Sequence, residues 1–175
     1  MNILFLTIGA FDSIEKHGLY PDLLRVFARE GHSLYIVSTR ERRTGLPTEL
    51  LEDASSHHLQ VRIGNITRTN LLEKGISTVT IGQCYQRAIQ KYWRDVRFDL
   101  VLYSTPPITL AGVVDWVKRR DGARTYLLLK DIFPQNAVDV GILKKSGLKG
   151  LIYRYFRAKE KKLYAISDRI GCMSQ

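Results

Sequence analysis

The chain has 175 residues, of which 45% are hydrophobic and 25% charged, and its formal net charge is +10. This length and composition predict one soluble globular domain that can bury a core without disulfides or metals. No apolar run is long enough to cross a membrane, and the N-terminus lacks the basic region of a signal peptide. The two cysteines, Cys84 and Cys172, form no metal-binding pattern and fit a reduced, cytoplasmic setting.

The first 38 residues predict a strand, a helix and a second strand. Residues 3–8 are apolar except for Thr7, as in a strand that is covered on both faces. Pro21 suits the first turn of a helix, and Gly31 can end it in a left-handed cap. With a second strand at residues 33–38, this is a βαβ unit, which is almost always right-handed.

The next segment is more polar. Residues 39–57 predict a loop that one helical turn at 48–53 could interrupt, and residues 58–63 alternate as in a strand. A helix is predicted over residues 75–94, although the β-branched side chains of residues 76–81 obscure where it begins.

The second half repeats the alternation of strands and helices. The predicted elements are a strand at 99–103, a helix at 108–120, a strand at 125–129, a short helix at 135–141, a longer helix at 148–166 and a last strand at 168–173. This order predicts a single α/β domain with a doubly wound, mainly parallel, Rossmann-like sheet.

Several motifs of nucleotide and hydrolase chemistry are missing. The sequence after the first strand is GAFD rather than GxGxxG, and there is no Walker A motif, so an NAD-dependent or ATP-dependent enzyme is disfavoured. The GxSxG nucleophile elbow of α/β-hydrolases is also absent.

Ligands of open α/β sheets bind at the carboxyl ends of the strands, a rule that here selects residues 9–17, 38–43, 104–107 and 130–139. Asp131 follows the predicted strand 125–129, and Pro134 comes shortly after it. A carboxylate there could take a proton from a substrate hydroxyl as a general base. The alternative is structural, with Asp131 capping the helix that begins near Pro134.

Three segments carry a family resemblance. They read KDIFP at residues 130–134, followed by VDVGIL at 138–143, REGHSLYIV at 29–37 and ISDRIGCMS at 166–174. Together they resemble family-4 retaining glycosyltransferases of the GT-B fold, notably the subgroup that builds capsular and O-antigen polysaccharides. The Gly-Gly pair that usually follows the first strand in this family is absent here.

The resemblance implies that this chain is the N-terminal, acceptor-side half of a GT-B fold. Most nucleotide-sugar contacts of the family, including an Glu-x7-Glu carboxylate pair, belong to a second Rossmann domain that this sequence does not contain. We therefore expect an excised domain, a truncated reading frame or one subunit of a split enzyme, inactive by itself. The donor would be a co-substrate, and neither a cofactor nor a metal is expected.

The resemblance also assigns roles to residues. The reaction would move a sugar from a nucleoside diphosphate to a polyprenyl-diphosphate-linked or other glycan acceptor, with retained configuration. Asp131 would be the catalytic base or would orient the acceptor. The expected acceptor-binding residues are Asp12, Ser13, His17, Ser104, Thr105, Lys130, Gln135 and Asn136. His17 could equally be a solvated loop residue.

A basic stretch lies between Lys144 and Lys162; it contains eight Lys and Arg residues and only one acidic residue, Glu160. Within the predicted helix 148–166, apolar residues share one face, which predicts first of all packing on the sheet. The expected contacts with an anionic membrane are Lys145, Lys149, Arg154, Phe156, Arg157 and Lys161. The alternative to membrane contact is a basic face that is only solvated. If the membrane contact exists, the protein is peripheral at the inner face of the plasma membrane.

Two rival functions fit the same charge. A nucleic-acid-binding domain is permitted by +10 but lacks a helix-turn-helix, RNP or zinc signature, so no nucleic-acid partner is expected. The other rival is a non-catalytic membrane-anchoring subunit that presents the acceptor to a separate donor-binding chain. Arg40, Arg42 and Arg43 could contact an acceptor diphosphate or only keep the protein soluble.

Overall fold

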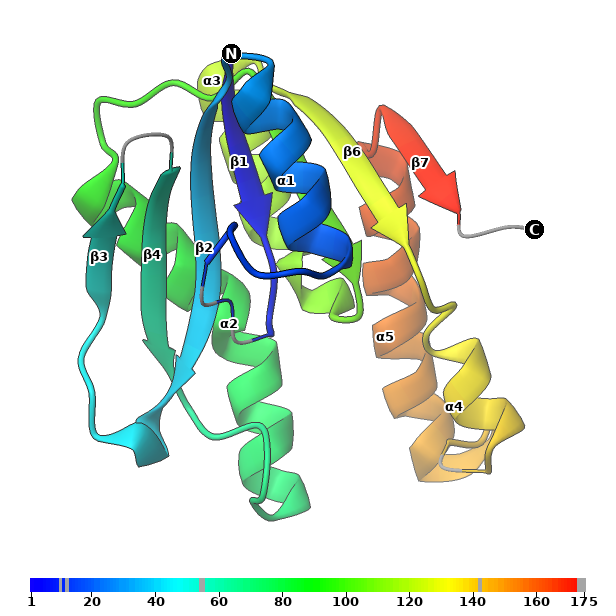
Figure 1. Cartoon of the computed structure of the whole chain (residues 1–175). Helices are drawn as coiled ribbons and strands as arrows, with labels where there is room; N and C mark the ends of the chain where they lie inside the picture. Colours follow the sequence, from blue (N-terminus) through cyan, green and yellow to red (C-terminus); the bar gives the residue numbers. More distant parts are fainter. Residues whose placement is uncertain (10, 12, 54–55, 142, 173–175) are drawn as a thin grey trace.

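A seven-stranded sheet with the order β3-β4-β2-β1-β5-β6-β7 forms the centre of the molecule (Figure 1). The computed structural model describes residues 1–9, 11, 13–53, 56–141 and 143–172. The strands are β1 (Asn2–Leu6), β2 (Ser33–Glu41), β3 (Glu49–Glu52), β4 (Ser56–Ile63), β5 (Leu100–Thr105), β6 (Arg124–Leu129) and β7 (Arg169–Cys172). The helices are α1 (Leu19–Arg29), α2 (Leu71–Tyr92), α3 (Ala111–Asp121), α4 (Gln135–Asp139) and α5 (Gly147–Ile166), with 3-10 turns η1 (Arg42–Thr44) and η2 (Ile108–Leu110).

The sheet confirms the predicted doubly wound, mainly parallel topology. Every strand pair is parallel except β3 with β4. β1 pairs with both β2 and β5. The first half of the chain therefore adds its strands on one side of β1, and the second half adds its strands on the other side. The switch point therefore lies between β1 and β5.

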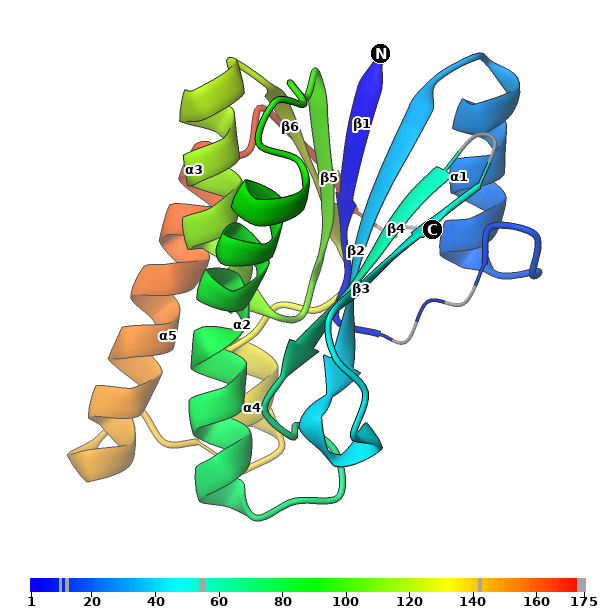
Figure 2. The ribbon, with the colours of Figure 1, turned by 90° about the vertical axis from the view of Figure 1, so that its left-hand side faces the viewer.

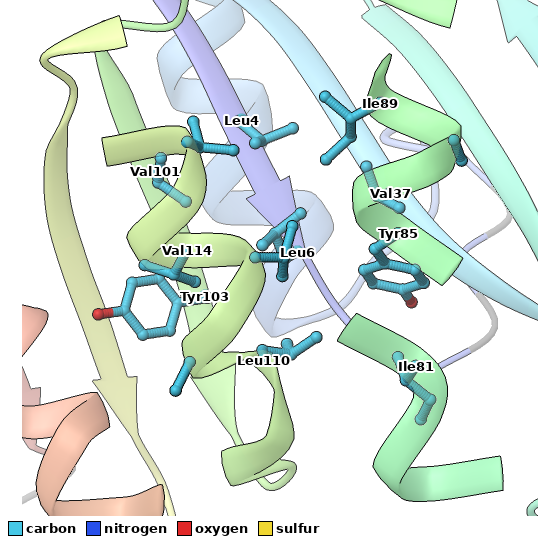
Figure 3. Close-up of a cluster of buried hydrophobic side chains, with 14 of the residues drawn as sticks. Leu4, Leu6, Val37, Ile81, Tyr85, Ile89, Val101, Tyr103, Leu110 and Val114 are labelled. Atoms are coloured by element: carbon cyan, nitrogen blue, oxygen red, sulfur yellow. The ribbon is translucent and has the colours of Figure 1, made fainter. Parts of the chain in front are cut away.

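The two faces of the sheet have separate cores, because successive side chains of a strand point to opposite faces. Ile3 and Phe5 of β1 pack with Leu24 of α1 on one face. Leu4 and Leu6 pack on the other face with the layer of α2, α3 and α5 (Figures 2 and 3). Both faces of β1 are thus buried, which explains its uninterrupted apolar sequence.

Helix α2 begins at Leu71, four residues before the predicted start at residue 75. Asn70 is its N-cap, and the side-chain oxygen of Asn70 accepts a hydrogen bond of 2.8 Å from the backbone N–H of Glu73. This cap satisfies one of the N–H groups that a helix start leaves without a partner. It fixes the beginning of a helix whose β-branched residues made the start ambiguous.

The prediction of a loop with a helical turn over residues 39–57 was wrong. β2 continues to Glu41, η1 follows, and residues 49–52 form β3, an edge strand antiparallel to β4, which itself begins at Ser56. The sequence of β3 is ELLE, which favours a helix locally, so pairing with β4 overrides that preference. At the chain ends, β1 stops at Leu6 and β7 at Cys172; the predicted last residue, Met173, lies outside the described residues.

The apolar face predicted for the helix at 148–166 packs on the core only in part. Leu163 is buried, and Phe156 and Ile166 pack against the same core. Leu151 and Tyr155, nearer the start of α5, are exposed instead. The reason is that the N-terminal half of α5 extends past the ends of β1 and β6, where there is no sheet to cover it (Figure 1).

Candidate functional site

The carboxyl ends of β1, β5 and β6 meet at one edge of the sheet, beside the switch point. Leu6 is in register with Tyr103, and Thr105 with Leu129, so the connections that leave these strands start side by side. Ligands of open α/β sheets bind at this position. The predicted candidates after β1, β5 and β6 therefore share one edge.

Asp131 lies two residues after the end of β6 and is exposed at this edge. The N-cap position of α4 is Pro134, and no side chain caps the helix. The alternative in which Asp131 caps this helix is therefore wrong. Across the residues that the structure describes, no hydrogen bond or ion pair engages the Asp131 carboxylate, so its oxygens can accept hydrogen bonds from a ligand.

The start of α1 and the segment after β6 come together at Lys130. Its Nζ lies 4.1 Å from the ring centroid of Tyr20, at the start of α1, and its backbone N–H donates to Thr105 Oγ1 at 3.3 Å. A cation over an aromatic face is attracted by the ring quadrupole. These two contacts join the beginning of α1, the end of β5 and the residue before Asp131.

The other predicted acceptor residues occupy different depths around this point. Ser104 and Thr105 are 5% and 1% exposed, so they support the edge from below rather than form its open surface. Gln135 Nε2 donates to Asp139 Oδ1 at 2.6 Å, while Asn136 is exposed.

In the first loop, the His17 side chain is 96% exposed, and its Nδ1 lies 3.7 Å from Asp22 Oδ1. Ser13 Oγ accepts a hydrogen bond of 3.1 Å from the backbone N–H of Glu15. Asp12 lies outside the described residues. The loop thus brings two of its predicted residues to the same end of the molecule as Asp131.

A cleft of about 450 Å³, a size typical of ligand sites, opens at the carboxyl ends of β1, β2 and β4. Its lining mixes apolar and hydrogen-bonding side chains: Ile8, Phe11, Ser38, Thr39, Arg40, Glu41, Arg43, Thr44, Leu46, Gln60, Ile66 and Thr67, with Gly9. Gly9, Phe11 and most of residues 38–43 belong to segments that the strand-end rule selects, but the sequence shows neither the contribution of β4 nor the continuation of the second strand past residue 38. The three additional β2 residues carry Thr39 and Glu41 to the cleft wall.

The arginines of this region are all paired with acids. Arg40 donates to Glu49 at 2.9 Å, and Arg42 donates to Glu73 at 2.9 Å. Arg43 Nε lies 3.1 Å from Glu41 Oε2. The guanidinium groups of Arg40, Arg42 and Arg43 are therefore each paired with a carboxylate of this chain.

A buried polar pair supports the same cleft. Ser38 Oγ lies 2.7 Å from His58 Nε2, and the two side chains are almost fully buried. The ring of Phe11 packs edge-on against His58, with the centroids 5.4 Å apart. This pair ties the end of β2 to β4 through a hydrogen bond that is protected from water.

Three of the six predicted membrane residues are exposed. Lys145, Arg154 and Lys161 are exposed, whereas Phe156 packs against Phe133 with the ring centroids 5.1 Å apart. Arg157 forms an ion pair with Glu160. The side chain of Lys149 lies outside the described part of the structure.

Two wider searches complete the description of the site. Over the described ranges, no three His, Cys, Asp or Glu side chains gather as metal ligands would. None of the helices described is both long enough and apolar enough to span a bilayer.

Comparison with known proteins relates the chain to glycosyltransferases. No protein-family model matches it. The probable glycosyltransferase WbjE of Pseudomonas aeruginosa is 29% identical over 103 residues, which are 59% of this chain and 24% of WbjE. The matched segment is thus about a quarter of that curated relative.

Two solved structures have the same fold. The E. coli structure described as trehalose-6-phosphate bound with UDP-2-fluoro glucose matches with a TM-score of 0.63 at 8% identity, over 100% of this chain and 40% of its own. An OtsA apo structure matches with a TM-score of 0.62 at 9% identity, over 99% and 40%. The fold therefore matches one half of a GT-B glycosyltransferase, and over 103 residues the sequence is similar to one probable glycosyltransferase.

Proposed function

We propose that the chain is the acceptor-side domain of a retaining, family-4-like glycosyltransferase of cell-surface polysaccharide synthesis, such as capsule or O-antigen. The similarity to WbjE and the half-GT-B fold support a glycosyltransferase domain. The observation that carries the proposal is Asp131, an exposed carboxylate at the carboxyl edge beside the switch point.

In this proposal Asp131 accepts a hydrogen bond from the acceptor hydroxyl and either takes its proton or orients it toward the donor sugar. Lys130 is held by Thr105 and Tyr20, which fixes the backbone that precedes Asp131. Ser13, His17, Gln135 and Asn136 supply hydrogen bonds around it, and Asp12 belongs to the same set. The nucleotide-sugar donor is a co-substrate held by a second domain, in the same polypeptide or in a separate chain.

The cleft at β1, β2 and β4 would hold a part of the acceptor that is remote from the reacting hydroxyl. β2 and β6 are three strand intervals apart in the sheet, which at about 4.8 Å each is roughly 14 Å. An acceptor that reaches both places is larger than one sugar unit. A polyprenyl-diphosphate-linked glycan has this length, and it places the protein at the inner face of the plasma membrane.

Peripheral contact with an anionic leaflet suits such an acceptor. Lys145, Arg154 and Lys161 are exposed on or beside α5, and each Lys or Arg near an anionic surface contributes about 1 kcal/mol. The same surface would serve a non-catalytic subunit that presents the acceptor to a separate donor-binding chain. In that case Asp131 would bind the acceptor without acting as a base.

The test is sugar transfer from labelled nucleotide sugars to membrane acceptors by this chain together with its donor-binding domain. Asp131→Asn should lower kcat by roughly 10²–10⁴-fold, the usual contribution of a general base. Asp95→Asn, at an exposed carboxylate near the amino edge, is the matched control and should keep normal turnover. Near-normal kcat in Asp131→Asn with a raised acceptor KM would favour the non-catalytic role, and no effect on either would remove Asp131 from the site.

A further inference from the structure

The helical layer on one face of the sheet exposes apolar side chains on its outer surface. They occur on two helices, α2 and α5, in the N-terminal half of each. Their exposed fractions are 76% for Leu72, 60% for Ile76 and 42% for Val79 on α2, and 59% for Leu151, 45% for Ile152 and 42% for Tyr155 on α5. The three residues of α2 recur at helical spacing, so they form one stripe, and it faces away from the core side of the helix.

The two stripes border a common groove. It has a volume of about 230 Å³ and is lined by Val79 and Gln83 from α2 and by Tyr155 and Lys159 from α5. Thr109 of η2 also lines it, and among the described residues its buried hydroxyl has no hydrogen-bond partner. Figure 2 shows α2 and α5 in the same layer, with their N-terminal halves toward the edge where the strands end.

The acidic side chain of α5 does not reach this surface. Glu160 is the only acid of the helix, and its side chain is 1% exposed. It forms an ion pair with Arg157 and accepts a hydrogen bond of 2.8 Å from the Tyr164 hydroxyl. The exposed charges of α5 in the structure are therefore all positive.

The acidic side chain of α2 is engaged in a similar way. Glu73 is the only acid of α2, and it accepts hydrogen bonds from Thr69 and from Asn65 Nδ2, the latter at 2.8 Å. Arg42 pairs with it at 2.9 Å. The hydrogen bond from Thr69, followed by those of Asn65 and Arg42, holds the pKa of this carboxyl below its ordinary value, so it stays ionised and paired at neutral pH. Lys74, Arg87 and Lys91 of α2 are exposed.

We propose that the outer faces of α2 and α5 together form a docking surface for an anionic lipid bilayer. Cations at the headgroups and apolar side chains below them are the combination by which interfacial helices bind bilayers. On these two helices no exposed acid opposes the cations, which is the charge complement of an anionic leaflet. This surface adds α2 to the basic face of α5 and so rests on the membrane contact in the proposed function; it brings the edge that bears Asp131 next to the lipid.

The experiment measures partition of the full chain onto vesicles, without any sugar substrate. One set of vesicles is phosphatidylcholine alone, and the other also contains phosphatidylglycerol. The wild type should bind the anionic vesicles and leave the neutral ones. Leu72→Gln/Ile76→Gln should lower the partition coefficient on anionic vesicles about tenfold, and Leu151→Gln/Ile152→Gln should do the same, because each pair loses two buried aliphatic contacts.

The matched control is Leu19→Gln/Val26→Gln on α1, which covers the opposite face of the sheet and exposes these side chains by 58% and 54%. It should bind vesicles as the wild type does, and thermal melting verifies that every variant is folded. Wild-type binding by the α2 pair would overturn the proposal, as would equal binding to neutral vesicles. So would a wild-type oligomer that the α2 pair dissociates without a change in vesicle binding, since that marks a protein interface. Because no transfer is measured, these outcomes are independent of the role of Asp131.

Discussion

Replacing Glu160 by Gln tests whether the buried ion pair of α5 contributes to stability. A hydrogen bond to a charged group contributes about 1.5–3 kcal/mol and a neutral one about 0.5–1.5 kcal/mol, and the amide can still accept from Tyr164. Breaking a fully buried pair costs about 3–5 kcal/mol, but the Arg157 side chain is 41% exposed and can regain water. We therefore expect a loss of about 1–2 kcal/mol in the free energy of unfolding.

Urea denaturation followed by circular dichroism measures this loss as a lower midpoint at an unchanged m-value. The melting temperature should fall by about 2–8 °C, from roughly 2–4 °C per kcal/mol for a domain of this size. Glu30→Gln, at an exposed acid after α1, should stay within about 0.5 kcal/mol of the wild type. A Glu160→Gln variant as stable as this control would contradict the prediction, because the buried carboxylate would then contribute no more to the free energy of unfolding than an amide.

Further predictions concern the amino edge and the packing of α2. The side chain of Asp121 is fully buried and accepts hydrogen bonds from Arg97 and Arg120. Burial raises the pKa of this carboxyl, but the hydrogen bonds outweigh burial, so the pKa lies below its ordinary value. Asp121→Asn should cost about 2–3 kcal/mol at pH 7. The difference from the wild type, measured by urea unfolding, should begin to shrink as the pH falls below about 4, where the carboxylate of the unfolded chain takes up its proton, and should be lost as the pH falls through the lower pKa of the native carboxylate. A constant difference would contradict this. A Cβ at Gly64 would lie 2.9 Å from Ser77 Cβ, so Gly64→Ala should cost about 1–3 kcal/mol, and less in a Ser77→Gly background. An equal cost in both backgrounds would show that Ser77 is not the obstacle.

The sheet was predictable because its central strands are buried on both faces. The mostly apolar segments at 3–8, 33–38, 99–103 and 125–129 match β1, β2, β5 and β6, and burial of these strands under helices accounts for such segments in a charged domain. The alternation with helices then fixed the parallel, doubly wound topology.

The errors lie where local preference and tertiary contacts disagree. β3 has a helix-favouring sequence, and its strand exists through pairing with β4. The spacing of Asn70 and Glu73 is typical of a helix N-terminus and indicates where α2 begins. The β-branched residues within 76–81 obscured this signal. For α5, a helical wheel shows which residues share a face but not where the sheet ends, so the exposure of Leu151 was not predictable.

The site was predictable in position but not in shape. The strand-end rule identified the segment of Asp131, and the structure places it at the carboxyl edge beside Thr105. The contact of Lys130 with Tyr20 joins residues that are 110 positions apart in the sequence, and no local pattern encodes it. The cleft at β1, β2 and β4 also depends on the length of β2. The last residues of this strand, 39–41, are polar, so the sequence pattern did not assign them to a strand.

The edge that carries Asp131 should bind a lipid-diphosphate-linked glycan. The most direct measurement is a titration of the isotope-labelled chain with farnesyl-diphosphoryl N-acetylglucosamine, followed by the NMR shifts of its backbone amides. We expect shifts at residues 13–17 and 130–136, none at the amino edge around residues 121–124, and binding at least about tenfold weaker in Asp131→Asn, equivalent to about 1.4 kcal/mol. Shifts confined to the amino edge, or equal affinity in the Asn variant, would contradict it.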